Sequence, residues 1–305
     1  MKASETNLQP IIEGTKQYVV PLFQRTYSWD TKNWNTLWED IRELSEDKEE
    51  RTHFIGSIVT MPTQSVPQGV PKYLLIDGQQ RLTTLYIFLA ALRDKARDTP
   101  GTLADEIDEV LLTNRFKVGD DAFKLLPTQG DRQSFIDIMQ GENGSHQDQI
   151  WKAYKYFQRQ LRTFGLETLD SLKRAIVDRL VLVSIVLDRD DNPHLIFESL
   201  NAKGRPLSQS DLIRNYFFMR IDVSDQENLY HTYWKPMQID LGEDLTEFIR
   251  HFLMRDGLFV KQSDVYFALK ERADQKRTQE EIKAYLQSLM QYSEYYVKLL
   301  RPDQE

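Results

Sequence analysis

The sequence predicts an α+β fold in which a mixed core is followed by a mostly helical C-terminal lobe. Up to about residue 225, short apolar runs typical of strands alternate with helical patterns. From residue 226 onward the pattern is almost entirely helical. We therefore expect two domains, covering residues 1–225 and 226–305.

Composition places the chain among ordinary globular proteins, with 305 residues of which 40% are hydrophobic and 28% charged. Cysteine is absent, which excludes disulfides, thiolate metal sites and cysteine nucleophiles. No apolar run approaches the roughly 20 residues of a membrane span, and no signal peptide is evident, so we expect a cytoplasmic protein without a membrane partner. The net charge of −8 argues against a broadly basic nucleic-acid surface but permits a local basic cleft.

The first elements can be assigned from apolar spacing. Residues 1–16 are interpreted as a polar lead-in, and residues 17–20 as a short strand. Apolar residues recur at helical spacing over 34–44, with Asp30 as the expected N-cap. The pattern over 53–61 is typical of a buried strand.

A second strand and a long helix surround an Asp-Gly turn. The strand begins at Tyr73 and ends at Asp77-Gly78, and the apolar positions of the helix that follows are nearly continuous from Leu82 to Leu92, which predicts burial on most sides. The runs 115–118 and 123–126 predict a β-hairpin. The remaining predicted elements are helices at 149–162 and 166–178, a strand at 180–187, a short helix from Asn192-Pro193 that ends before Gly204, and a helix from the capping box Ser208–Asp211 to about Arg220.

The turn Asp77–Arg81 is the stretch whose residues most clearly suit a binding or catalytic site. A strand, a glycine and a helix N-terminus together form a common anion site. The first helical N–H groups have no intrahelical partner, the helix dipole is positive there, and glycine lets an anion approach closely. The pattern leaves open whether this turn binds an anion or is only a capped connection.

Three motifs occur in order along the chain. They are Val20-Pro-Leu-Phe-Gln-Arg-Thr-Tyr-Ser-Trp29, Asp77-Gly-Gln-Gln-Arg-Leu-Thr83, and Phe197-Glu-Ser-Leu-Asn-Ala-Lys-Gly-Arg-Pro-Leu207, which leads to Asp211. This set resembles the N-terminal domain of GmrSD-type restriction enzymes. The resemblance implies a ParB/sulfiredoxin-like nucleotidase core that acts in modification-dependent DNA restriction or other anti-phage defence. It also implies an HNH-type nuclease domain, which this sequence does not show.

The resemblance and the turn together suggest site residues. The candidate catalytic residues are Asp77, Gln79, Gln80 and Arg81. The planar fork of Arg81 suits bidentate phosphate binding, Asp77 could hold Mg²⁺ or orient the attacking water, and either glutamine could contact phosphate or position water. The candidate nucleotide-binding residues are Gln24, Arg25, Gly78, Thr83, Asn201, Lys203 and Gly204.

A second set of residues is a candidate for sensing modified DNA. It comprises Tyr27, Arg25, Arg205 and Arg214. Arg25 could pair with phosphate, and Tyr27 could stack on a base or anchor the chain to the core. The sequence does not separate a nucleotide role from a DNA role for this block.

The leading hypothesis is a Mg²⁺-dependent NTP-binding and NTP-hydrolysing sensor domain of a DNA restriction enzyme. Its expected partners are a nucleoside triphosphate (GTP among the candidates), DNA with or without a modification such as phosphorothioate, and a nuclease domain elsewhere. Further copies of the chain are an additional candidate partner. Two alternatives remain open: a DNA-sensing module without turnover, and a ParB-like nuclease domain in its own right.

Overall fold

A computed structural model describes residues 1–63, 69–142, 144, 146–188, 191, 196, 208–276 and 278–302, with only the backbone at 223 and 224. Contacts group the chain into two compact units, which we call unit 1 (Met1–Pro21 and Arg25–Asp191) and unit 2 (Leu22–Gln24 and Asn192–Glu305). Each unit has its own hydrophobic core. Because units defined by contacts need not coincide with domains, the boundary predicted near residue 225 stays a prediction.

The described part of unit 1 contains a mixed sheet of six strands in the order β1-β6-β3-β4-β2-β5. The strands are Lys2–Asn7 (β1), Gln17–Val19 (β2), His53–Pro62 (β3), Lys72–Asp77 (β4), Leu125–Leu126 (β5) and Leu180–Val186 (β6). β3 runs antiparallel to β4 and parallel to β6, with an irregularity in the β3–β6 register between Phe54 and Ser57. The mixed sheet confirms the α+β class expected from the sequence.

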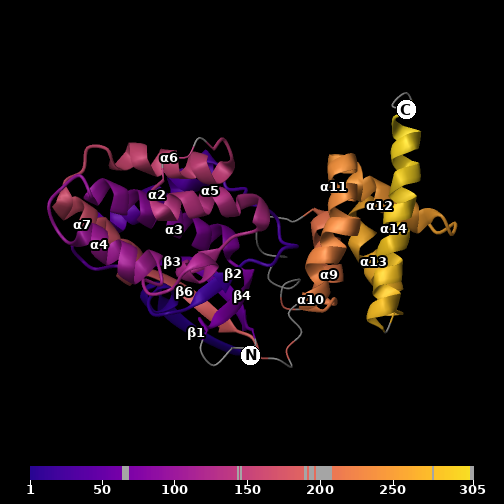
Figure 1. Ribbon diagram of the computed structural model, residues 1–305, viewed down its shortest axis with the longest axis horizontal. Helices are drawn as coiled ribbons and strands as arrows, with labels where there is room; N and C mark the ends of the chain where they lie inside the picture. Colours follow the sequence, from indigo (N-terminus) through magenta and orange to yellow (C-terminus); the bar gives the residue numbers. More distant parts are fainter. Residues whose placement is uncertain are drawn as a thin grey trace. The chain divides into compact units, whose positions relative to one another are not determined.

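Helices α2, α3, α5 and α6 gather on one side of this sheet (Figure 1). The helices of unit 1 are α1 (Gln9–Ile12), α2 (Thr31–Glu46), α3 (Gln79–Ala96), α4 (Leu103–Glu106), α5 (Gln129–Gln140), α6 (Gln149–Leu161) and α7 (Leu166–Arg174), with π-helical turns at Ile107–Leu112 and Ala175–Arg179 and a 3-10 turn at Gly119–Ala122. Asp30 caps α2 as predicted, because its carboxylate accepts from the N–H groups of Lys32 and Asn33 at 3.0 and 3.4 Å.

Helix α3 forms the centre of the unit 1 core. Every residue from Leu82 to Arg93 is buried, which confirms the burial predicted from its continuous apolar pattern. The ring of Phe88 stacks on Phe157 of α6, with 4.5 Å between centroids, and lies 5.6 Å from the ring of Trp38 of α2. Each buried aromatic ring of this kind stabilises the fold by roughly 1.5–3 kcal/mol. This packing fixes the position of the first turn of α3.

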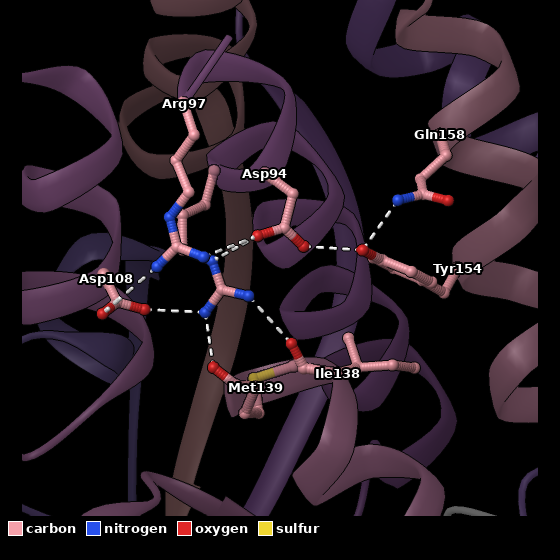
Figure 2. Close-up of polar contacts among 8 residues, drawn as sticks. Asp94, Arg97, Asp108, Ile138, Met139, Tyr154 and Gln158 are labelled. Carbon is pink, nitrogen blue, oxygen red and sulfur yellow. Dashed lines mark hydrogen bonds and ion pairs between the residues drawn. The ribbon is translucent and has the colours of Figure 1, made fainter. Parts of the chain in front are cut away.

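A buried arginine, Arg93, lies in the last turn of the same helix. Arg93 has no exposed surface, and its guanidinium donates to Asp94 at 2.9 Å, to Asp108 at 2.7 Å and to the carbonyl of Ile138 at 2.8 Å. The Ile138 and Met139 carbonyls belong to the last turn of α5, where the regular helical hydrogen bonds end, and the Ile138 carbonyl also accepts from the Gly141 N–H at 3.1 Å. Figure 2 shows this cluster, in which the two carboxylates lie on α3 and on the π-helical turn at Ile107–Leu112.

Two local predictions in unit 1 are wrong. Residues 1–16 are not merely a lead-in, since Lys2–Asn7 forms edge strand β1 beside β6. The hairpin expected at 115–118 and 123–126 does not form. Leu125–Leu126 pairs in parallel with β2, and the nearest antiparallel contact is an isolated bridge between Thr113 and Phe123. Alternating apolar residues at 116 and 118 imitate a strand, but both side chains point to solvent.

The described part of unit 2 is helical, as the sequence predicts for this region. Its helices are α9 (Gln209–Met219), α10 (Val223–Leu229), α11 (Lys235–Leu241), α12 (Leu245–Met254), α13 (Val265–Asp274) and α14 (Gln279–Leu300), with a π-helical turn at Tyr230–Trp234 and 3-10 turns at Gly242–Asp244 and Gln262–Asp264. Ser208 caps α9 by accepting from the Asp211 N–H at 3.1 Å. The short helix predicted from Asn192-Pro193 and the turn at Gly204 lie outside the described residues, except for position 196.

One short segment from the N-terminal part of the chain belongs to unit 2. The Phe23 side chain is buried in the unit 2 core and stacks on Phe218 of α9, with 6.1 Å between ring centroids. The Arg214 side chain donates to the Phe23 carbonyl. No helix in the described parts of either unit is long and apolar enough to cross a lipid bilayer.

Candidate functional site

The turn between β4 and α3 has the backbone geometry of an anion site. Gly78 precedes the helix with φ 89° and ψ 8°, a left-handed conformation that residues with a Cβ rarely adopt. A Cβ at this position would lie 3.0 Å from both the Ser57 carbonyl oxygen and the Ile58 side chain. Glycine is therefore required by conformation and by space. The N–H groups at the start of the 18-residue helix α3 lie directly after this turn.

The Arg81 side chain lies against strand β3. Its Nη1 atom donates to the carbonyl of Ser57 at 2.5 Å. Gly56 has φ +103°, and a Cβ added there would lie 2.9 Å from Nη1. The glycine therefore leaves the space that the guanidinium fills, at the irregularity in β3 between Phe54 and Ser57. Neither Gly56 nor Ser57 was among the residues predicted from the sequence.

Burial works against both charges at the turn. It raises the pKa of Asp77, while the Arg81 charge, a hydrogen bond with the Gly78 backbone and the Arg25 charge lower it, and the net shift is upward. Burial likewise lowers the pKa of Arg81, and the Asp77 charge only partly opposes this. The structure thus brings Asp77, Arg81 and Arg25 into one electrostatic environment, although Arg25 is more than 50 residues away in sequence.

The two glutamines of the motif hold the segment Arg25–Ser28. The Gln79 side chain donates to the Arg25 carbonyl at 3.2 Å. Gln80 donates to the Thr26 carbonyl at 3.2 Å and accepts from the Ser28 N–H at 2.7 Å. Both ends of the Gln80 amide are used, and the residue is only 8% exposed. These contacts favour a positioning role for Gln80 and join the first two sequence motifs.

Tyr27 is buried where the first and second sequence motifs meet. Its hydroxyl accepts from Trp34 Nε1 at 2.8 Å and lies 2.7 Å from the Thr84 hydroxyl. The Thr84 hydroxyl has one proton, which it donates to the Gln80 carbonyl. In the contact between the two hydroxyls, Tyr27 is therefore the donor and Thr84 the acceptor. The Tyr27 ring is 5% exposed, so its placement favours the anchoring alternative over stacking on a base.

Asp131 is a supporting residue that sequence reasoning missed. One of its carboxylate oxygens accepts from the Tyr27 N–H and from the Thr128 hydroxyl, each at 2.7 Å. Burial raises the pKa of Asp131, and these two hydrogen bonds oppose the shift. The residue lies in the first turn of α5, a helix that the sequence analysis did not predict. A local signal was present, because Thr128 precedes Asp131 by three residues as in a helix N-cap.

The remaining candidates are placed as follows. Gln24 is buried and belongs to unit 2, whereas Arg25 is half-buried and Thr83 is buried, both in unit 1. Arg214 is 4% exposed, and besides Phe23 its guanidinium contacts Asp211 at 2.7 Å and Gln238 at 3.2 Å within unit 2. The candidates of the third motif, Asn201, Lys203, Gly204 and Arg205, lie outside the described residues.

Taken together, the described site belongs to an α+β protein with a strand–glycine–helix turn flanked by arginines, an arrangement suited to binding anions. The sequence matches the family model of the GmrSD restriction endonuclease N-terminal domain over residues 8–218, more than half of the chain. The chain belongs to this family, which confirms the resemblance drawn from the three motifs. None of the curated proteins matches the sequence significantly.

Proposed function

We propose that the chain is the NTP-binding and NTP-hydrolysing sensor domain of a modification-dependent restriction enzyme, with a nucleotidase core related to the ParB/sulfiredoxin fold. The observation that supports this most is the turn at Asp77–Gly78. There a helix N-terminus begins beside the side chains of Arg81 and Arg25, and both arginine charges act on Asp77. Membership in a restriction endonuclease family supplies the DNA context.

Each residue has a distinct role in this proposal. The phosphates lie at the start of α3, where Gly78 allows close approach and Arg81 and Arg25 balance their charge. Asp77 orients the attacking water or holds a metal ion. Thr83, Gln24 and the third-motif residues Asn201, Lys203 and Gly204 are retained as candidate nucleotide contacts.

Mg²⁺ fits this site as an ion that arrives with the nucleotide. No group of three or more His, Cys, Asp or Glu side chains that could hold a metal occurs among the described residues. Mg²⁺ often binds through one or two carboxylates together with substrate phosphates, so Asp77 alone is a sufficient protein ligand. The bound ion supplies positive charge next to the phosphates.

The nucleotide state reports recognition of modified DNA to a nuclease domain of the HNH type in this proposal. The nuclease is encoded elsewhere in the same protein or in a partner subunit, and the assembly is cytoplasmic and can include further copies of the chain. Arg25 and Arg205 are retained as candidate DNA contacts.

The first test measures phosphate release from ATP, GTP, CTP and UTP with Mg²⁺, with and without DNA, for the wild type and Asp77→Asn. We expect turnover of at least one nucleotide, its loss on chelation of Mg²⁺, and a decrease by a factor on the order of 10²–10³ in Asp77→Asn, because this variant removes the carboxylate that orients the attacking water or holds the metal ion. Asp98→Asn is the control, since Asp98 is 65% exposed and, among the residues that the structure describes, forms an ion pair only with Lys95. Absence of both turnover and nucleotide binding in the wild type would refute the proposal.

A second prediction concerns Gly56. In Gly56→Ala the new methyl group occupies the place of the Arg81 guanidinium, so Arg81 must move and turnover is expected to fall by about tenfold to a hundredfold, as small misplacements at active sites do. Gly257→Ala is the matched control. Gly257 also has a positive φ, +86°, but no heavy atom lies within 4 Å of the position that a Cβ would take there, so the variant carries the backbone strain without displacing a side chain. Equal turnover in the two variants would show that the pose of Arg81 against β3 is not needed.

One observation favours a second candidate function, a DNA-sensing module without turnover. Gln79, Gln80 and Arg81 all make contacts within unit 1, so the motif can serve as a scaffold for the segment Arg25–Ser28. Salt-sensitive DNA binding by the wild type, combined with no phosphate release, would support this candidate over the first.

A further inference from the structure

The loop Arg115–Val118 exposes two apolar side chains almost completely. Phe116 and Val118 are each 89% exposed, more than any other large hydrophobic residue in the described part of the chain. Cationic residues alternate with them, and the guanidinium of Arg115 lies 5.5 Å from the centre of the Phe116 ring. Exposed aromatic and cationic side chains in alternation are typical of surfaces that bind single-stranded nucleic acid.

A cavity of about 410 Å³ opens beside this loop. Its volume is within the range of about 300–1,000 Å³ that is typical of small-molecule sites. The walls are formed by Gly14 and Thr15, by Glu109, Val110 and Thr113, by the loop residues Asn114–Lys117, and by Lys124. The cavity therefore has room for a planar ring of nucleobase size next to Phe116.

The base of the loop is held firmly. Asn114 is 5% exposed, and its side-chain amide donates to the carbonyls of Lys16 at 3.1 Å and Asp121 at 3.0 Å. Its backbone N–H donates to the Ala122 carbonyl at 2.8 Å. Phe116 is thus presented from an anchored loop, which reduces the conformational entropy lost on binding.

The charges around the loop favour binding of a phosphate at Lys117. Two carboxylates near the loop are already paired: Glu109 with Arg115 at 2.5 Å and Asp121 with Lys72 at 2.9 Å. Among the described residues, no carboxylate forms an ion pair with Lys117, so its ammonium group is available to a phosphate.

Lys124 adds a second amine at the wall of the cavity. Its ammonium group donates to the carbonyl of Ile12 at 2.9 Å and to that of Val110. Burial, with a smaller contribution from Lys16, lowers the pKa of Lys124 to about 8, and the Glu13 charge partly opposes this shift.

We propose that this loop and cavity bind an unpaired nucleotide of the DNA on which the family acts. The base stacks on Phe116 with its edge in the cavity, and an adjacent phosphate pairs with Lys117. A ring that projects from the surface can stack only on a base whose face is open, which selects single-stranded or extruded nucleotides. The inference extends the DNA recognition in the proposed function and does not depend on nucleotide hydrolysis at Asp77.

The test is fluorescence anisotropy of the full 305-residue chain, without NTP, against a labelled single-stranded oligodeoxynucleotide and the same sequence as a fully paired duplex. We expect tighter binding of the single strand. Phe116→Ala is expected to weaken it by about fivefold to a hundredfold, the range that corresponds to the stacking of one base on an aromatic ring. Lys117→Ala, tested as a separate variant, is expected to weaken single-strand binding at low salt and to reduce the dependence of affinity on salt concentration.

Two controls make the outcome decisive. Val118→Ala removes an equally exposed apolar side chain from the same loop, at a residue that does not line the cavity, and should bind like the wild type. Phe259→Ala removes a 74% exposed phenylalanine from unit 2 and should also have no effect. Phe116→Ala binding as tightly as Val118→Ala, or equal loss of single-strand and duplex binding in Phe116→Ala, would overturn the proposal. A loss of phosphate release in a chain that still binds the single strand would instead count against only the proposed function.

Discussion

Alanine in place of Arg81 is expected to decrease phosphate release by a factor of about 10³ or more, the scale seen when an arginine that stabilises a transferring phosphoryl group is removed. The guanidinium is a charged hydrogen-bond donor beside the turn, and its charge lowers the pKa of Asp77. Its loss therefore removes phosphate contacts and also disfavours the ionised form of Asp77. Steady-state phosphate release and nucleotide binding, measured over a range of pH, would separate the two effects.

Two further variants distinguish a role in chemistry from a role in folding. Arg81→Lys keeps the charge but loses the planar fork, so it should retain nucleotide binding better than Arg81→Ala while remaining slow. Arg42→Ala removes an exposed arginine of α2 that forms ion pairs with Glu39 and Glu46 on the same helix, and should leave turnover unchanged. If Arg81→Ala is folded by circular dichroism and hydrolyses NTP at the wild-type rate, Arg81 belongs to the scaffold and the site lies elsewhere.

Methionine in place of Arg93 is expected to lower the free energy of unfolding by about 3–5 kcal/mol, the cost of removing one partner from a buried ionic cluster. Asp94 and Asp108 lose their fully buried partner, and the Met139 carbonyl at the end of α5 loses its side-chain donor, while the Ile138 carbonyl retains the Gly141 N–H (Figure 2). The midpoint of thermal unfolding of unit 1 should fall on the order of 10 °C. Differential scanning calorimetry and urea titration would measure both quantities.

Arg97→Met is the control for Arg93. Arg97 joins the same carboxylates, but its side chain is 48% exposed, and ion pairs in such positions contribute at most about 1 kcal/mol. A loss of stability in Arg93→Met no greater than in Arg97→Met would contradict the view that burial makes this cluster essential.

The elements predicted best from the sequence are those whose formation is determined by neighbouring residues in the chain. The apolar run of α3, the Asp30 cap of α2 and the strand before Asp77 each carry their own signal, and all three occur in the structure. Strand β1 has no such signal, because all its residues but Ala3 are polar and four of the six are exposed at the edge of the sheet. Helix α5 lacks such a signal in its first half, because its apolar residues begin only at Phe135.

The candidate site was predictable only in part for a related reason. Asp77, Gly78 and Arg81 are contiguous in a recognisable motif, so the sequence could single them out. The contact of Arg81 with Ser57 spans 24 residues, and that of Tyr27 with Asp131 spans 104. These partners are defined by how strands and helices meet in space, and no periodicity along the chain encodes that meeting.

The placement of Phe23 limits how this protein can be divided or recombined. The chain enters unit 2 for three residues, Leu22–Gln24, long before it reaches the rest of that unit. A fragment that ends after Asp191 would retain Phe23 without Phe218 and Arg214, and a fragment that starts at Asn192 would have a vacancy in its core. Exchange of the C-terminal part between relatives must therefore carry a compatible residue at position 23, although that position lies in the N-terminal tenth of the sequence. Co-expression of the two fragments, with and without Phe23→Ala, followed by co-purification, would show whether the Phe23 side chain is needed for the fragments to associate.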